Sequence, residues 1–297
     1  KLGIHASPTC TMQFGDKGGA IGYLVGEENQ GLKYMFTMMN NARLSVGLQG
    51  VALAERATQA AIQYAEGRYQ GKLLSGGATV TINNHPDVAR MIGLMQALTK
   101  AGRALAYEAA FYLDKAGAGD AKAQARVDLL TPIVKAWCTD NAVDVASLGV
   151  QVHGGMGFIE ETGAAQYYRD ARILPIYEGT NGIQANDLVF RKVLRDKGAA
   201  MSDWIASIKT ATKSNQVLEA VSKLEQATAA LLAETDPDNQ ALAATTYLEL
   251  CGIIGGAAML ERVAAHHADG ASLSEFYGVH VLTKTEGLGA RLNKILA

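Results

Sequence analysis

The most informative stretch of the chain is residues 169–184, which reads RDARILPIYEGTNGIQ. It places one carboxylate, Glu178, between Tyr177 and Gly179 and directly after an apolar run. A carboxylate in such surroundings loses solvation, which suits a general base that removes a weakly acidic proton near neutral pH. Gly179 gives the backbone freedom to bring Glu178 close to a ligand. The residues alone also allow a structural interpretation, in which Glu178 is only paired with a nearby arginine.

Long helices must position this segment. Apolar residues at helical spacing predict one helix from Gly31 to about Gly67, and a second that opens with Pro86 in its first turn. Asp120 is expected to cap a third helix, which Pro132 should kink or restart. The chain after Gly198 predicts four more helices, near residues 200–213, 215–235, 239–268 and 274–295. Methionines 35, 38 and 39 begin an apolar stripe and are expected to lie in the core.

Residues 1–27 differ from the rest of the chain. Two strand-like stretches, 9–14 and 20–25, flank the glycine-rich turn 15–19, which predicts a short β-hairpin. We therefore expect an all-α fold, an antiparallel helical bundle with a hairpin remnant at its N-terminus. The expected domains are 1–27, 28–198 and an appended helical domain at 199–297.

Composition narrows the class of protein. The 297 residues are 48% hydrophobic with a net charge of -2, and no run of lysine or arginine suggests a nucleic-acid surface. The three cysteines are scattered, with no metal-ligand spacing, which favours a reducing compartment and predicts a cytoplasmic protein without a metal site. No apolar run is long enough to span a bilayer, so we expect no membrane-spanning segment. Because the chain begins at Lys1 without a methionine, we expect it to be part of a longer protein.

Several motifs, in order along the chain, resemble the acyl-CoA dehydrogenase family. Residues 177–184 resemble its Y-E-G-T-x-x-I-Q signature, residues 151–158 its Q-x-x-G-G-x-G-[FY] motif, and residues 169–170 its R-D pair. Residues 2–9 and 26–32 resemble the end of the family's middle β-domain and the entry into its first C-terminal helix. Several ordered motifs together are specific, whereas any one of them would be weak.

The resemblance implies α,β-dehydrogenation of an acyl-CoA thioester with FAD as cofactor. Glu178 would take the α-proton while the β-hydrogen leaves as hydride to the flavin. A neighbouring backbone N–H would help to polarise the thioester carbonyl. Gly179 and Tyr177 would line the substrate, and Arg43 matches a family arginine near the CoA end. A helix arginine in an ion pair within the same helix remains the alternative for Arg43.

The resemblance also implies a set of cofactor-binding residues. Arg68 matches the family arginine that meets the FAD pyrophosphate of the neighbouring subunit, although a solvated arginine at a helix end is an equal alternative from the residues alone. The other expected cofactor-binding residues are Gln151, Gly154, Gly155, Thr180 and Asn181. Gln151 and Gly155 would contact the adenosine part of the partner's FAD, and Thr180 and Asn181 the flavin side. His85 and His153 are expected to be ordinary polar positions.

The resemblance implies partners as well. The parent protein is expected to form a homodimer, to bind acyl-CoA, and to pass electrons to an electron-transfer flavoprotein. The sequence also resembles a long subfamily of these enzymes that carries an extra C-terminal helical domain. That subfamily includes enzymes acting on 3-methylthiopropanoyl-CoA. The alternatives are an acyl-CoA oxidase, a non-enzymatic DNA-binding relative from the alkylation response, and a plain helical scaffold.

Overall fold

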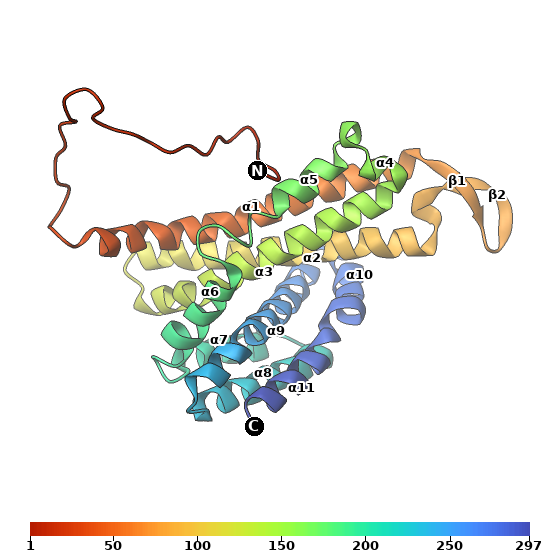
Figure 1. The fold of residues 1–297 in the computed structure, drawn as a ribbon. Helices are drawn as coiled ribbons and strands as arrows, with labels where there is room; N and C mark the ends of the chain where they lie inside the picture. Colours follow the sequence, from red (N-terminus) through yellow and green to blue (C-terminus); the bar gives the residue numbers. More distant parts are fainter.

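Three long helices lie side by side and form the body of the molecule, with a second group of helices packed across one face (Figure 1). The computed structural model describes residues 1–297, apart from the side chains at positions 37, 268 and 269. The body consists of α1 (Gly31–Gly67), α2 (Pro86–Gly117) and α3 (Ala121–His153). These are the three long helices that the sequence predicts.

Glycines on α1 allow α1 and α3 to pack closely. A Cβ atom added at Gly47 would lie 2.6 Å from Val134 Cγ1, and one at Gly50 would lie 2.7 Å from the carbonyl oxygen of Cys138. The Asp120 carboxylate caps α3 as expected, accepting from two backbone N–H groups at 3.0 Å. Pro132 neither ends nor restarts α3, which is assigned as one helix of 33 residues.

Short elements connect α3 to the second group of helices. They are α4 (Gly155–Phe158), a 3-10 turn (Glu160–Thr162), α5 (Ala164–Ala171), α6 (Asn181–Asn186) and a π-helical stretch (Asp187–Val193). The second group comprises α7 (Ala199–Ala211), α8 (Asn215–Ala233), α9 (Pro237–Ala264), α10 (Ala268–Tyr277), a π-helical turn (Gly278–Leu282) and α11 (Lys284–Ile295). The helices of the second group fall close to the ranges that the sequence predicts, whereas the sequence predicts no helix at α4 or α5.

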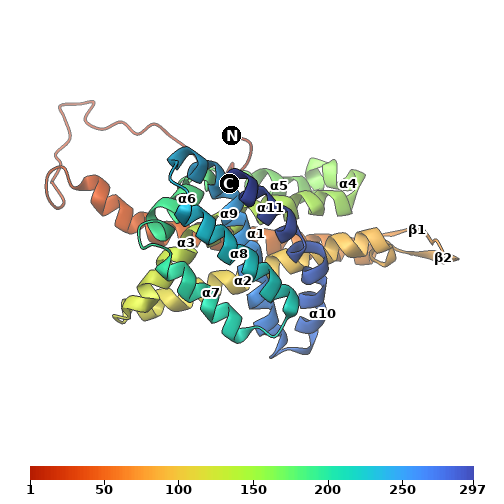
Figure 2. The same cartoon turned by 90° about the horizontal axis from the view of Figure 1, so that it is seen from below.

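Helix α9 joins the second group of helices to the body (Figures 1 and 2). A Cβ atom added at Gly252 would lie 2.3 Å from Trp137 Cγ, so α9 rests directly on the indole ring of α3. By length and composition α9 could cross a membrane, contrary to the expectation from sequence, but 78% of its most apolar window is buried inside the protein. Its apolar composition is therefore explained by its position between α3 and the other appended helices.

The expected N-terminal hairpin is wrong. The backbone of residues 1–30 contains no strand, although the predicted turn forms and Gly19 donates to the carbonyl oxygen of Gly15 at 3.0 Å. A two-stranded hairpin is marginally stable alone, and here the two stretches have no sheet to join. The hairpin that does form lies elsewhere, as antiparallel strands β1 (Tyr69–Leu73) and β2 (Gly76–Thr81) projecting beyond α1 and α2 (Figure 1). The sequence predicts no strand in that region.

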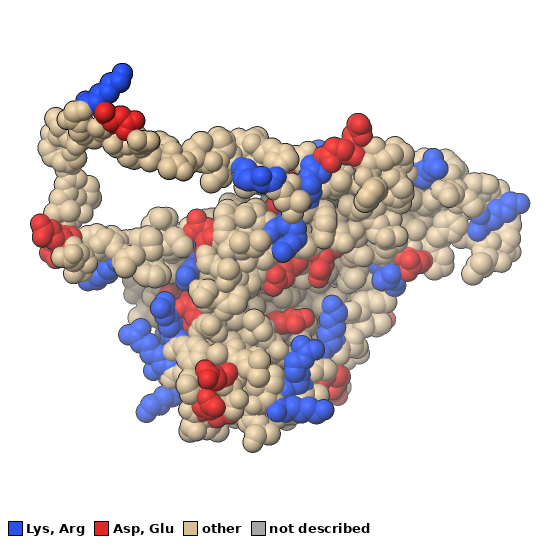
Figure 3. Space-filling view, viewed as in Figure 1, with Lys and Arg blue, Asp and Glu red and all other residues tan. Residues whose placement is uncertain are grey.

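The expectation of a buried methionine stripe is also wrong. The exposed fractions of Met35 and Met38 are 39% and 58%, because the first turns of α1 extend beyond the helices that cover its middle. Leu32, Tyr34 and Phe36 are exposed on the same turns. Charged side chains of both signs are interspersed over the face shown in Figure 3, and no basic patch stands out on that face.

Candidate active site

Two consecutive left-handed residues shape the turn that carries Glu178. Glu178 has a φ of +57° and Gly179 a φ of +84°. A side chain in the left-handed region costs on the order of 1–2 kcal/mol, so the turn is held by its surroundings rather than by local preference. The following residue, Thr180, accepts a hydrogen bond from the Ile183 N–H at 3.3 Å and so caps α6.

The Glu178 carboxylate is held without a hydrogen-bond partner on one of its oxygens. The residue is half-buried, and its Oε2 atom is buried and unpaired in the described structure. Beside it, the Tyr177 hydroxyl donates to Gln49 Oε1 on α1. Burial, and then the charge of Glu178, raise the pKa of Tyr177 above its usual value. An unpaired buried carboxylate oxygen is costly unless a ligand uses it, as a general base does.

Backbone donors accompany this carboxylate. Among the described residues, the N–H groups of Glu178, Gly179 and Thr180 donate to no atom of the chain. Unused N–H groups on a fixed turn are suited to a ligand carbonyl on which negative charge develops. The turn therefore offers a proton acceptor and carbonyl-binding donors together.

A buried lysine that the sequence analysis missed supports this turn. Lys135 of α3 is completely buried, and its Nζ atom donates to the carbonyl oxygens of Leu174 and Gly179 at 3.0 and 2.8 Å. A third bond, at 2.8 Å, goes to Asn181 Oδ1. Nothing in the local sequence around residue 135 signals this role, because its acceptors lie about forty residues later.

The side chain of Asn181 points toward α3. Its Nδ2 atom donates to Asp140 Oδ1 at 2.8 Å and to the carbonyl oxygen of Ala136 at 3.1 Å. A flavin contact by this side chain, which the resemblance implies, would require breaking these bonds. Gln184 is completely buried behind the turn, and its Nε2 atom lies 3.4 Å from the Gly179 carbonyl oxygen.

Arg43 lies behind Gly179 in a buried ion pair. Its Nη1 atom is 3.2 Å from Asp187 Oδ2, and the two side chains are 6% and 9% exposed. Its Nη2 atom would lie 3.7 Å from a Cβ atom at Gly179. Arg43 is therefore ion-paired, but the pair joins two separate elements and is not the intrahelical pair that the sequence suggests as the alternative.

The expected cofactor-binding residues fall into two groups. Thr180 and Asn181 directly follow the Glu178 turn, whereas Arg68 lies at the far end of α1, roughly 28 Å beyond Gln49 at about 1.5 Å per residue. Gln151, Gly154 and Gly155 lie at the same end, where Tyr64 and His153 stack with ring centroids 4.5 Å apart. The structure thus brings each group together but keeps the two groups apart within one chain.

Residues 29–192 match the acyl-CoA dehydrogenase C-terminal domain family. The chain belongs to the acyl-CoA dehydrogenase family. It is 60% identical over 204 residues to the 3-methylmercaptopropionyl-CoA dehydrogenase of Ruegeria pomeroyi, a match that covers 67% of this chain and 34% of that protein. A broad-specificity linear acyl-CoA dehydrogenase of Mycobacterium tuberculosis is 37% identical over 262 residues, covering 84% of this chain and 42% of that one.

The fold is shared with solved structures of the acyl-CoA dehydrogenase family. An acyl-CoA dehydrogenase from Bacillus anthracis, solved in complex with FAD, superposes with a TM-score of 0.74 at 19% identity. That match covers 92% of this chain and 51% of the other. This chain therefore spans only about a third to a half of the length of its acyl-CoA dehydrogenase relatives.

The second group of expected cofactor-binding residues, at the far end of α1, is suited to contact part of an FAD molecule. It consists of Arg68, Gln151, Gly154 and Gly155. Arg68 is exposed at the end of α1 and has no ion pair in the described structure, so its guanidinium is free for a phosphate. Gly154 and Gly155 are exposed, and a Cβ atom at either would meet nothing within 4 Å. These features agree with an anionic cofactor approaching this end of the bundle from outside the chain.

Other polar residues of this acyl-CoA dehydrogenase chain have structural partners. If Glu178 were not the base, the alternatives on α1 would be Glu55 and Glu66, and Glu55 lies 2.8 Å from Arg103. Burial raises its pKa, but hydrogen bonds from Gln59 and Arg103 outweigh this and hold that pKa below its usual value. His85 opens α2 and contacts the carbonyl oxygen of Gln70 at 2.8 Å. The described residues contain no cluster of histidine, cysteine or acidic side chains suited to a metal.

Proposed function

We propose that this chain is part of an FAD-dependent acyl-CoA dehydrogenase in which Glu178 is the catalytic base. The observation that carries the proposal is the buried, unpaired Oε2 atom on a strained turn with free backbone donors. Family membership and the 60% identity to an enzyme named for an acyl-CoA substrate supply the reaction class. FAD would be held by Thr180 on one side and, from a second copy, by Arg68, Gln151, Gly154 and Gly155.

In this reaction Glu178 removes the proton from the carbon α to the thioester. The backbone N–H groups of residues 178–180 are unused within the chain and available to the thioester carbonyl, where they would stabilise the developing negative charge. FAD, when bound, supplies the hydride acceptor. Gly179 would line the acyl chain beside Glu178, and Tyr177 holds the turn against α1 through Gln49.

Substitution of Glu178 tests this proposal. In the full-length protein, Glu178→Gln should lower kcat by about 10²–10⁴-fold, because an amide cannot accept the α-proton. The kcat of Glu178→Asp should lie between those of the wild type and Glu178→Gln, since moving the carboxylate by about 1 Å can cost on the order of 10²-fold in rate. Turnover is measured with an acyl-CoA panel and an artificial electron acceptor, alongside FAD content and melting temperature.

Two further variants control the experiment. Glu219→Gln changes an exposed carboxylate on α8 and should leave turnover unchanged. Glu55→Gln tests the alternative base on α1 and should affect stability rather than the chemical step, because Glu55 is paired with Arg103. Near-normal turnover by Glu178→Gln, or loss of turnover confined to Glu55→Gln, would show that Glu178 is not the base.

The acceptor and the cellular setting are part of the same proposal. We propose a cytoplasmic homodimer that passes electrons to an electron-transfer flavoprotein. An acyl-CoA oxidase remains the second candidate within the same chemistry, and rapid peroxide formation by the full-length protein would identify it. A DNA-binding role is disfavoured by the mixed charges of the face in Figure 3 and by the net charge of -2.

A further inference from the structure

The ammonium group of Lys135 forms all of its hydrogen bonds with the turn that carries Glu178 or with the residue that begins the next helix. Its three hydrogen bonds go to Leu174 and Gly179, on either side of Glu178, and to Asn181 at the start of α6. An ammonium group has three N–H donors and no acceptor, so this residue is fully used. None of the three partners is a carboxylate.

Such a lysine is costly to bury. Loss of solvation lowers the pKa of Lys135 to about 8, and the nearby charge of Arg43 acts in the same direction. The charges of Asp140 and Glu178 act in the opposite direction. Because a buried charge is weak support for stability, the three bonds of Lys135 to the turn point to a role other than stability.

The position of the bonds explains what that role is. The carbonyl groups of residues 174 and 179 are fixed to one atom, so the four residues between them are closed into a short loop. Within this loop, Tyr177 is fixed to α1, and the strained backbone of Glu178 has little freedom left. Releasing Lys135 would allow the turn to relax toward ordinary backbone angles and would move the carboxylate.

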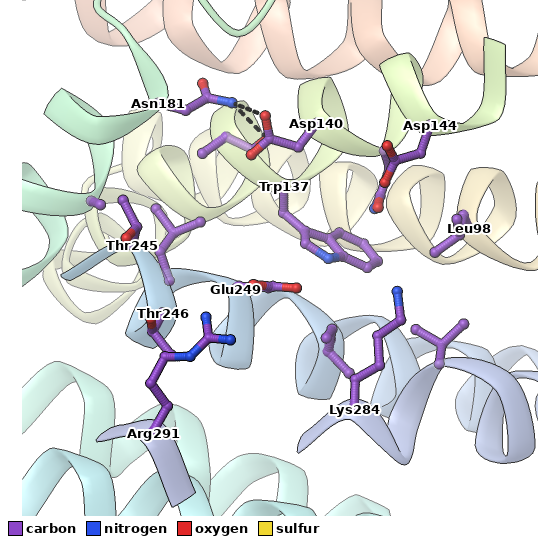
Figure 4. Close-up of a pocket in the computed structure, with 16 residues that line it drawn as sticks. Leu98, Trp137, Asp140, Asp144, Asn181, Thr245, Thr246, Glu249, Lys284 and Arg291 are labelled. Carbon is purple, nitrogen blue, oxygen red and sulfur yellow. Dashed lines mark hydrogen bonds between the residues drawn. The ribbon is translucent and has the colours of Figure 1, made fainter. Parts of the chain in front are cut away.

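The hydrogen bonds of Lys135 also connect the turn to a cavity beside the helices that follow residue 198. Asn181 links Lys135 to Asp140, whose carboxylate faces a cavity of about 300 Å³ (Figure 4). Glu249 of α9 and Lys284 and Arg291 of α11 line the cavity on the side of the appended helices. The cavity therefore lies between α3, the start of α6, α9 and α11.

We infer that Lys135 is a positioning residue that holds Glu178 in its productive geometry through the carbonyl groups on either side of it. This inference rests on the proposed role of Glu178 as the base. Lys135 is completely buried, and all three of its donors bond within the chain. Loss of Lys135 should therefore increase the mobility of residues 172–184 and lower kcat, with little change in cofactor content.

The test compares three variants of the full-length protein. Lys135→Met keeps the length of the side chain but removes all three donors, and Lys135→Gln keeps a neutral donor group. Thr131→Val is the matched control, since Thr131 is buried one helical turn earlier on α3 and bonds only to the carbonyl oxygen of Val127. The readouts are kcat, KM for acyl-CoA, FAD content and amide hydrogen exchange. Exchange is compared between residues 172–184, which include the turn, and residues 91–109 of α2, which serve as the reference segment.

Lys135→Met should lower kcat by about 10²-fold, the order expected when a catalytic group is misplaced by about 1 Å, with KM and FAD content little changed. Exchange should accelerate in residues 172–184 but not in residues 91–109. For Lys135→Gln, both kcat and the exchange of residues 172–184 should lie between those of the wild type and Lys135→Met. Thr131→Val should resemble the wild type in both measurements. A kcat within twofold of wild type, or exchange that accelerates equally in both segments, would overturn the inference.

Measurements on the unmodified protein keep the test decisive if the Lys135 variants fold poorly. Above pH about 8 the neutral amine has one donor fewer, so protection of residues 172–184 should fall relative to residues 91–109 after correction for intrinsic exchange. Unchanged relative protection up to pH about 10 would count against the inference. The proposed function is tested separately by Glu178→Gln, so either can fail while the other stands.

Discussion

At the scale of single residues, the candidate site combines one reactive group with several that only hold it. Glu178 presents a carboxylate oxygen that the chain leaves unpaired. Lys135, Gln49 and Gln184 instead contact the backbone or the neighbouring tyrosine of the same turn. Reactivity and position are therefore supplied by different residues, and substitutions should separate them.

Arg43 provides a prediction at this scale. Arg43→Met should lower the free energy of unfolding by on the order of 3 kcal/mol, because it leaves the buried Asp187 carboxylate with a single partner, the exposed Arg191. Chemical denaturation measures this change. The matched control is Arg191→Met, which removes that exposed partner at 3.5 Å and should cost about 1 kcal/mol or less.

The same pair of variants also decides between the two interpretations of Arg43. A structural ion pair predicts a loss of stability with KM for acyl-CoA nearly unchanged. A direct contact with the CoA end of the substrate predicts the reverse, a raised KM in a protein of normal stability. The buried, paired guanidinium leads us to expect the first result.

At the scale of elements, the close approach of helices depends on small residues that face large ones. Gly252 of α9 lies against the indole of Trp137 on α3, and Gly256 lies against the far edge of the same ring. This contact fixes where the appended helices sit on the body of the molecule. It also places α9 beside α6, the helix that begins directly after the Glu178 turn.

Gly252→Ala should therefore destabilise the protein by about 1–3 kcal/mol, the usual cost of adding volume to a filled core. The added methyl group would lie 2.3 Å from Trp137 Cγ, so α9 or the indole must move. Trp137 fluorescence and the melting temperature report the change. As a control, Gly287→Ala on the exposed face of α11 meets nothing within 4 Å and should be neutral or stabilising by up to about 1 kcal/mol. Equal melting temperatures for the two variants would contradict the proposed packing constraint.

At the scale of the whole molecule, the separation of the two groups of cofactor-binding residues predicts shared sites. Arg68 is too far along α1 to reach the Glu178 turn of its own chain. In a twofold dimer, each chain can supply Arg68 to the site that contains its partner's Glu178. Each site would then be built from two copies.

Mixed dimers test this arrangement. Homodimers of Glu178→Gln and of Arg68→Gln should both be impaired, the first in turnover and the second in FAD content. Heterodimers purified with two different tags should contain one fully intact site and regain about half of the wild-type turnover per dimer. If Arg68 instead served its own chain, both sites of the heterodimer would be damaged and turnover would stay near that of the impaired homodimers. A monomeric full-length flavoprotein in light scattering would also contradict the arrangement.

The sequence by itself determined the features that depend on neighbours along the chain. Helix periodicity and capping predicted α1, α2 and α3, and the motif around residues 177–184 identified the turn and its family. These signals are local, because helix and turn formation depend on residues a few positions apart. The roles of Glu178 and the cofactor-binding residues stay predictions until the experiments above are done.

Only the tertiary structure decided the rest, because the deciding contacts join residues far apart in the sequence. Lys135 acquires its role from carbonyl groups about forty residues later, and Arg43 acquires its partner at Asp187. Residues 20–25 have a strand-like sequence, yet strand formation requires a neighbouring strand that the described chain does not place there. Met35 and Met38 belong to an apolar stripe, but whether a stripe is covered depends on which helix packs against it. Local sequence sets what each segment can form, and packing over long distances sets which of those possibilities are realised.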